Sequence, residues 1–137
     1  MEHTIQCLCG AVKMKLIGEP MQCVYCHCDD CQLVHGGAYL PAAMYLTSQA
    51  QIVDGDPVRW RLKTTERATC RQCGTRMFAE PAGLGVRSIT ASLLPEGVFR
   101  PAFHMQCQHA VLPIQDELPH FKQYPAIFGG SDERMPW

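Results

Sequence analysis

Seven of the nine cysteines in this 137-residue chain fall into three short clusters. The clusters are Cys7-Leu8-Cys9-Gly10, Cys26-His27-Cys28-Asp29-Asp30-Cys31 and Cys70-Arg71-Gln72-Cys73-Gly74. Thiolates at such spacings can converge on one soft, tetrahedral metal ion. Seven sulfurs divide into a closed set of four and an open set of three, so the sequence predicts two metal sites.

The four-sulfur site is predicted from two half-sites that lie far apart in the chain. Cys70 and Cys73 stand three residues apart and are followed by Gly74, which permits the positive φ that such a turn often needs. Two sulfurs are half a site, and Cys7 and Cys9 supply the other half. We therefore expect a structural zinc ion that joins the N-terminal segment to the middle of the chain, and we expect loss of Cys73 to unfold the protein.

The central cluster offers three thiolates, Cys26, Cys28 and Cys31, within six residues. Three protein ligands with one open position are the arrangement of a catalytic zinc site. Cys23 leaves an alternative open, because it would complete a set of four and make the second site a closed, structural one. A disulfide or a redox role for Cys23 with Cys26 is a further alternative. Cys107 stands alone and is interpreted as a small buried hydrophobic residue.

Composition limits the class of protein. The length fits one domain, and the formal net charge of -1 offers no electropositive surface to nucleic acid. No apolar stretch approaches the roughly 18 residues of a membrane span, and no export signal opens the chain. An odd number of cysteines at short spacings favours metal binding in a reducing compartment over disulfides. We expect a single zinc-binding domain over 1–137, in the cytoplasm, without a nucleic-acid or membrane partner.

Apolar and polar residues alternate in several segments, which is typical of half-buried strands. Glycine and proline turns separate these segments, so the fold class is predicted to be mainly β, with short antiparallel sheets and at most one or two short helices. A short helix is expected at 29–34, ended by Gly36-Gly37. The part after Arg100 is expected to be an extended tail. Strands are predicted at 12–16, 38–46, 58–62, 75–79 and 86–93.

The three cysteine motifs, in this order and spacing, resemble the glutathione-dependent formaldehyde-activating enzyme family, which also includes the centromere protein V group. The resemblance extends into the tail, where His104 is followed by Leu118-Pro119-x-Phe121-x-x-x-Pro125, and covers about 5–126.

This resemblance implies a β-tent-like fold of several short antiparallel sheets. It also implies a structural zinc at Cys7, Cys9, Cys70 and Cys73 and a catalytic zinc at Cys26, Cys28 and Cys31. The activity of the family is carbon-sulfur lyase chemistry, which interconverts S-hydroxymethylglutathione with glutathione and formaldehyde. The implied partner is therefore a small, glutathione-like thiol or thiol adduct.

Histidines near the clusters are further candidates, because an imidazole titrates near neutral pH. His35 is the candidate catalytic residue, and His27 and His104 could also transfer protons or complete the zinc site. His3, His109 and His120 are expected at the surface.

Charged residues receive two interpretations each. Asp29 and Asp30 are interpreted as a helix cap rather than as proton acceptors. Arg59, Arg61 and Lys63 could meet glutathione carboxylates or form a solvated strand face.

The sequence thus predicts a zinc-dependent enzyme of the carbon-sulfur lyase type that acts on a small thiol adduct such as S-hydroxymethylglutathione. The alternative is a non-catalytic zinc-binding interaction module with two closed sites. A thiol redox sensor that uses Cys23 and the central cluster is a third hypothesis.

Overall fold

The computed structural model describes all residues, 1–137, and consists of ten β-strands, one short α-helix and four 3₁₀ turns. The prediction of a mainly β chain with one or two short helices is confirmed. Two compact units divide the chain, and each is described by itself. The first unit is Met1–Gln22 with Ala43–Phe99, and the second is Cys23–Ala42 with Arg100–Trp137.

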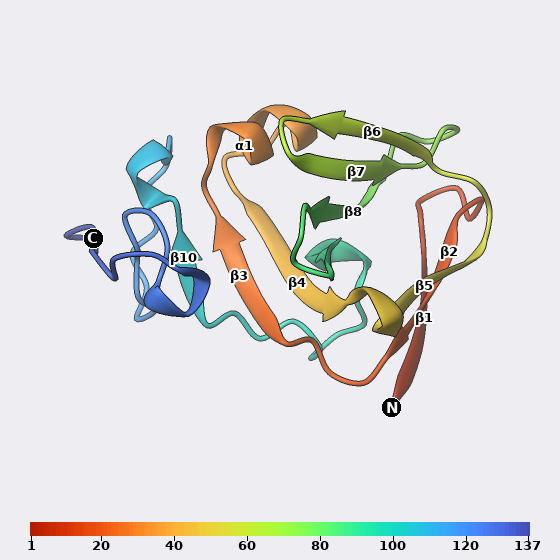
Figure 1. The fold of residues 1–137 in the computed structure, drawn as a ribbon, viewed down its shortest axis with the longest axis horizontal. Helices are drawn as coiled ribbons and strands as arrows, with labels where there is room; N and C mark the ends of the chain where they lie inside the picture. The colour runs from red at the N-terminus through yellow and green to blue at the C-terminus, as the bar shows by residue number, and fades with distance from the viewer. The chain divides into compact units, whose positions relative to one another are not determined.

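A three-stranded antiparallel sheet opens the first unit. Strands β1 (Glu2–Gln6), β2 (Lys13–Ile17) and β5 (Ala50–Asp54) lie in the order β1-β2-β5 (Figure 1). Met14 and Leu16 of β2 are fully buried, whereas Lys13 and Lys15, which alternate with them, are partly exposed. The alternating pattern that predicted a half-buried strand at 12–16 is therefore confirmed.

Four further strands of the first unit follow one another as antiparallel neighbours. They are β6 (Val58–Leu62), β7 (Thr65–Thr69) and β8 (Arg76–Pro81), which are labelled in Figure 1, and β9 (Val86–Thr90). Met77, Phe78 and Ile89 are almost completely buried. By contrast, Val58 and Trp60 remain 37% and 38% exposed. The strand at 58–62 was predicted correctly, but its predicted half-burial is wrong because β6 ends the strand order and has one neighbour, β7.

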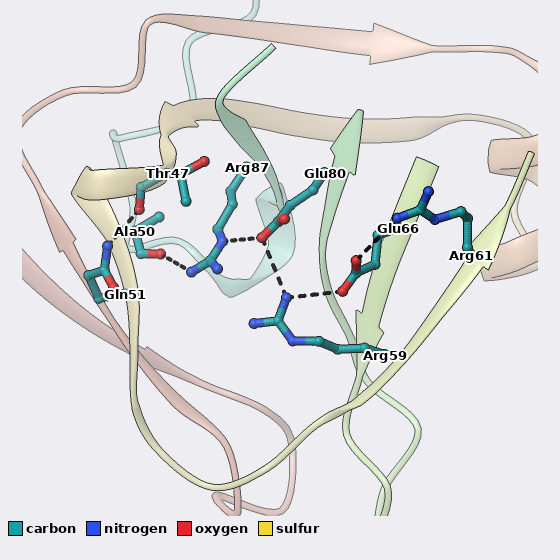
Figure 2. Close-up of polar contacts among 8 residues, drawn as sticks. All are labelled: Thr47, Ala50, Gln51, Arg59, Arg61, Glu66, Glu80 and Arg87. Atoms are coloured by element: carbon teal, nitrogen blue, oxygen red, sulfur yellow. Dashed lines mark hydrogen bonds and ion pairs between the residues drawn. The ribbon is translucent and has the colours of Figure 1, made fainter. Parts of the chain in front are cut away.

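Ion pairs connect the strands of the first unit (Figure 2). Arg87 Nε donates to Glu80 Oε1 at 2.5 Å, and its Nη1 donates to the carbonyl oxygen of Ala50 at 2.6 Å. The Arg59 guanidinium lies 3.2 Å from a carboxylate oxygen of Glu66 and 3.6 Å from one of Glu80. The two arginines therefore share the Glu80 carboxylate.

The second unit is built around a parallel strand pair. β10 (Phe103–Met105) lies beside β3 (Gln22–Cys26), with His104 opposite Tyr25 (Figure 1). On its other side, the His104 backbone donates to Pro119 at 2.9 Å and accepts from Phe121 at 2.9 Å. The part after Arg100, predicted to be an extended tail, thus contributes a short strand and a β-bridge to this unit.

Helix α1 (Asp29–His35) follows β3 directly. Its N-cap is Cys28, whose sulfur accepts from the Cys31 backbone N–H, and Gly36 ends it at φ 75°. The predicted helix is confirmed, but the cap is Cys28 rather than the Asp pair, which occupies the first turn.

The remaining elements are one further strand and four 3₁₀ turns. No helix in the structure has both the length and the apolar character that a membrane crossing requires. The further strand is β4 (Leu40–Leu46), and the 3₁₀ turns are η1 (Thr47–Gln49), η2 (Ala91–Leu93), η3 (Cys107–His109) and η4 (Ala126–Phe128).

Candidate metal centres

Two similar tight turns present the four cysteines of the first unit. In one turn, the Gly10 backbone N–H donates to the carbonyl oxygen of Cys7 at 3.0 Å. In the other, that of Gly74 donates to Cys70 at 3.0 Å. Both glycines have positive φ, 81° at Gly10 and 76° at Gly74, where a side chain would be strained. The positive φ predicted for Gly74 is confirmed, and Gly10 adopts the same conformation directly after Cys9.

The four sulfurs converge as a metal ion would require. The Cys7 and Cys9 sulfurs are 3.7 Å apart, as are those of Cys9 and Cys70, and the whole set with Cys73 lies within 4.8 Å. A tetrahedral ion with bonds of about 2.3 Å to sulfur holds its ligands about 3.8 Å apart. All four are free cysteines. The structure therefore unites the two half-sites that the sequence placed 61 residues apart, and their geometry fits zinc.

The pKa values of two cysteines in this cluster, Cys73 and Cys9, are shifted in opposite directions. A hydrogen bond with the Thr75 hydroxyl, at 3.1 Å, and backbone N–H groups lower the pKa of Cys73 to about 5. An Ala11 backbone hydrogen bond lowers the pKa of Cys9, but burial and the other three cysteines outweigh it and raise the value to about 11. Four close thiols cannot all ionise without a compensating cation. The site is therefore suited to a divalent metal ion.

Three cysteines of the second unit form another group. Cys26 ends β3, Cys28 caps α1, and Cys31 lies in its first turn; the three sulfurs are within 4.8 Å of one another. The Cys31 backbone N–H lies 3.3 Å from the Cys28 sulfur. Hydrogen bonds with Cys28 and Cys31, together with burial, raise the pKa of Cys26 well above its usual value. A strand end and a helix start thus place three donors around one point.

Cys23 does not belong to this group. It lies three residues before Cys26 on β3, which corresponds to about 10 Å along a strand and to the opposite face. Cys107 is buried at 2% exposure in η3, which agrees with its interpretation as a small hydrophobic residue. Burial and the charge of Asp116 raise the pKa of its thiol to about 12.

A buried chain of polar side chains lies in the same unit. His27 Nε2 is 2.9 Å from His104 Nδ1, and His104 Nε2 is 2.7 Å from Asp116 Oδ2. Asp116 Oδ1 accepts from the Leu118 backbone N–H and lies 2.9 Å from His120 Nε2. His27 and His104 are completely buried and His120 is 4% exposed, so the predicted surface position of His120 is wrong.

Aromatic rings surround these histidines. Tyr25 stacks on His104 with ring centroids 4.7 Å apart, and the Trp137 ring lies 4.8 Å from His120. Burial and the neighbouring histidines lower the pKa of His27 to about 4. Burial also lowers the pKa of His104 despite its contact with Asp116. Both imidazoles are therefore neutral near pH 7. Sequence analysis missed Asp116 and His120, because no local pattern connects them to His104.

The predicted catalytic candidate, His35, is the last residue of α1. It lies four residues after Cys31, so both side chains share one face of the helix. A Cβ at Gly37 would come within 2.7 Å of the His35 ring, so Gly37 leaves the space that this ring occupies. His109, predicted at the surface, is exposed, and its Nδ1 lies 3.7 Å from Asp29.

Tyr124 is a second residue that sequence analysis missed. Burial raises the pKa of its phenol, a hydrogen bond with Gln106 lowers it, and the charges of Cys26, Cys28 and Cys31 raise it further. The phenol therefore stays protonated at neutral pH.

Sequence analysis left two interpretations open for the basic residues at β6, an anion-binding face and a solvated strand face. Arg59 pairs with Glu66 and Glu80, and Arg61 lies 3.9 Å from Glu66 (Figure 2). A polar cleft of about 180 Å³ lies beside these residues. The two arginines are engaged by carboxylates of their own unit, which favours the interpretation as a solvated strand face.

These observations define a class: a mainly β protein with one four-cysteine and one three-cysteine cluster, each able to hold a metal ion. The sequence pattern of the family described as glutathione-dependent formaldehyde-activating enzyme matches residues 2–109. The chain belongs to this family, as its cysteine motifs predicted.

A solved structure supports the fold. A Rhodobacter sphaeroides protein, determined by crystallography in a structural genomics programme, is similar with a TM-score of 0.56 and 23% sequence identity. The similarity covers 72% of this chain and 90% of that protein. No curated protein matches the sequence.

Proposed function

We propose that this protein is a zinc-dependent enzyme of the carbon-sulfur lyase type, acting on a small thiol adduct such as S-hydroxymethylglutathione. In this proposal, Cys7, Cys9, Cys70 and Cys73 hold a structural zinc, and Cys26, Cys28 and Cys31 hold a catalytic one. Clustered cysteines with metal-ligand spacing suit a reducing compartment, and we place the protein in the cytoplasm.

The single observation that carries the proposal is the difference between the two clusters. One set offers four sulfurs and fills a tetrahedral ion, whereas the other offers three and excludes Cys23. A zinc ion with three protein ligands keeps a position for an external ligand. Zinc in the second cluster would bind the substrate sulfur and favour its thiolate form.

The reaction itself has a simple balance. The carbon-sulfur bond of the adduct breaks, sulfur keeps the electron pair, and the hydroxyl oxygen loses its proton and becomes the carbonyl oxygen of formaldehyde. Tyr124, which stays protonated, is suited to donate a hydrogen bond to the substrate. His35, on the same helix face as Cys31, is our candidate for accepting the hydroxyl proton.

The test is Cys28→Ser, with zinc content and turnover of S-hydroxymethylglutathione as readouts. Serine is a good helix N-cap, so this change removes the thiolate and preserves the start of α1. We expect a folded protein with one zinc fewer and no turnover. The matched control is Cys23→Ala, which removes a buried cysteine of β3 and should retain wild-type zinc content and activity.

Two results would contradict the proposal. An active, folded Cys28→Ser protein would show that the cluster is not catalytic. The second result concerns the wild-type protein. If it retains two zinc ions, if small thiols do not affect the second site, and if it turns over no thiol-aldehyde adduct, the non-catalytic zinc module is favoured.

A further inference from the structure

Three side chains outside the cysteine clusters converge in the second unit. The candidate ligand atoms of His104, Asp116 and His120 all lie within 4.8 Å of one another. Both imidazoles are almost fully buried, while the Asp116 side chain is 31% exposed. Two histidines and one carboxylate are a common ligand set for a divalent transition metal with open coordination positions.

The contact of His120 with Asp116 differs from that of His104, whose Nε2 forms an ordinary hydrogen bond with Asp116 Oδ2 at 2.7 Å. His120 Nε2 lies 2.9 Å from Asp116 Oδ1, yet this buried nitrogen makes no hydrogen bond. A short contact that misses hydrogen-bond geometry indicates that the nitrogen does not point at the oxygen. Ligands about 2.1 Å from one ion and about 90° apart are themselves about 3 Å apart, with both aimed at the ion. The His120 contact has that form.

The surroundings fit a metal ligand at His104 as well. Histidine ligands usually form a hydrogen bond through their second ring nitrogen, which fixes the orientation of the ring. His104 Nδ1 has such a partner in His27 Nε2, at 2.9 Å. The Leu118 backbone N–H in turn fixes the Asp116 carboxylate. Because Asp116 is partly exposed, an ion can reach the site from solvent.

We propose that His104, Asp116 and His120 form a third metal site, for a divalent transition-metal ion. Nitrogen and carboxylate donors make it harder than the two thiolate clusters, so it suits Co²⁺, Ni²⁺, Fe²⁺ or Zn²⁺. It shares no ligand with the proposed catalytic centre, and its existence does not depend on lyase activity.

Trp137 supplies a local probe. Its ring lies 4.8 Å from that of His120, and the chain has one other tryptophan, Trp60. In a Trp60→Phe background, fluorescence therefore reports on the surroundings of Trp137 alone. Protein that carries two zinc ions per chain, one for each cysteine cluster, is titrated with Co²⁺, a paramagnetic ion that quenches nearby tryptophan. Absorption is recorded in parallel, because cobalt bound to thiolates shows sulfur-to-metal charge-transfer bands that a histidine-carboxylate site lacks.

We expect saturable quenching at one Co²⁺ per chain without thiolate bands. Asp116→Asn and His120→Gln should weaken this binding by at least about 100-fold, the upper range for loss of an outer-shell partner. The matched control His3→Gln removes a partly exposed histidine of the first unit and should bind Co²⁺ like the parent. Cys28→Ser should also retain the quenching, which separates this site from the three-cysteine cluster.

Three outcomes would overturn the proposal. One is the absence of saturable quenching in the folded parent protein. Another is unchanged Co²⁺ affinity in Asp116→Asn, a variant of a partly exposed side chain that tests the site even if His120→Gln fails to fold. Quenching that disappears in Cys28→Ser and appears with thiolate bands would likewise assign the ion to the cysteines.

Discussion

Replacing Arg87 with methionine tests whether its buried contacts stabilise the first unit (Figure 2). The Arg87 side chain is only 11% exposed, and its guanidinium lies 4.6 Å from the Phe78 ring centroid. Methionine preserves most of the length and the apolar packing over that ring. It removes the positive charge and the hydrogen bonds to Glu80 and to the Ala50 carbonyl.

The expected loss follows from what each partner retains. Ala50 is fully buried, and a buried carbonyl left without its donor costs about 1 to 3 kcal/mol. Glu80 is 26% exposed and keeps Arg59 at 3.6 Å, so its loss is smaller, about 1 kcal/mol. Methionine packing offsets part of the total. We expect the free energy of unfolding to fall by about 2 to 3 kcal/mol.

Urea unfolding of the zinc-loaded protein measures this change. With a slope of about 2 kcal/mol per molar urea, the midpoint should fall by about 1 to 1.5 M. Arg61→Met is the matched control, because Arg61 is 64% exposed and its ion pair of 3.9 Å should contribute less than about 0.5 kcal/mol. If Arg87→Met loses no more stability than Arg61→Met, the reasoning from burial and hydrogen bonding is wrong.

Three other changes test separate features. Cys73→Ser should contain one zinc ion fewer by elemental analysis and should show no cooperative unfolding transition. Cys23→Ala should retain the wild-type zinc content and the cooperative transition. Gly55→Ala should lower the free energy of unfolding by more than about 2 kcal/mol, since φ is +86° and the new Cβ would lie 2.1 Å from the Ala11 carbonyl oxygen. The control is Gly83→Ala, where φ is similar but no atom lies near the new Cβ. It should lower the free energy of unfolding by less. Because burial raises the pKa of Cys107 from 9.0 to about 12, the unfolded chain loses this proton first, so stability should fall as pH rises from 9 to 12. Comparison with Cys107→Ala isolates that slope, and equal slopes would exclude Cys107 as its cause.

The sequence by itself determined the local features of this protein. Cys-x-Cys-Gly and Cys-x-x-Cys-Gly specify tight turns, because glycine accepts the positive φ that follows the cysteine. The helix at 29–34 was predictable because its end signal, Gly36, follows the segment closely in the sequence. The cysteine spacing also indicated the family, because cysteines that bind one metal ion from the same turn must stand a fixed, small number of residues apart.

Tertiary structure decided the features that depend on strand order and register. Val58 and Trp60 have the pattern of a half-buried strand, but the position of β6 at the end of the strand order leaves them exposed. The parallel pairing of β10 with β3 brings His104 to His27, and the bridge between His104 and His120 buries a histidine that the sequence placed at the surface. Alternation and spacing describe each segment separately, whereas burial and long-range contacts depend on which segments become neighbours.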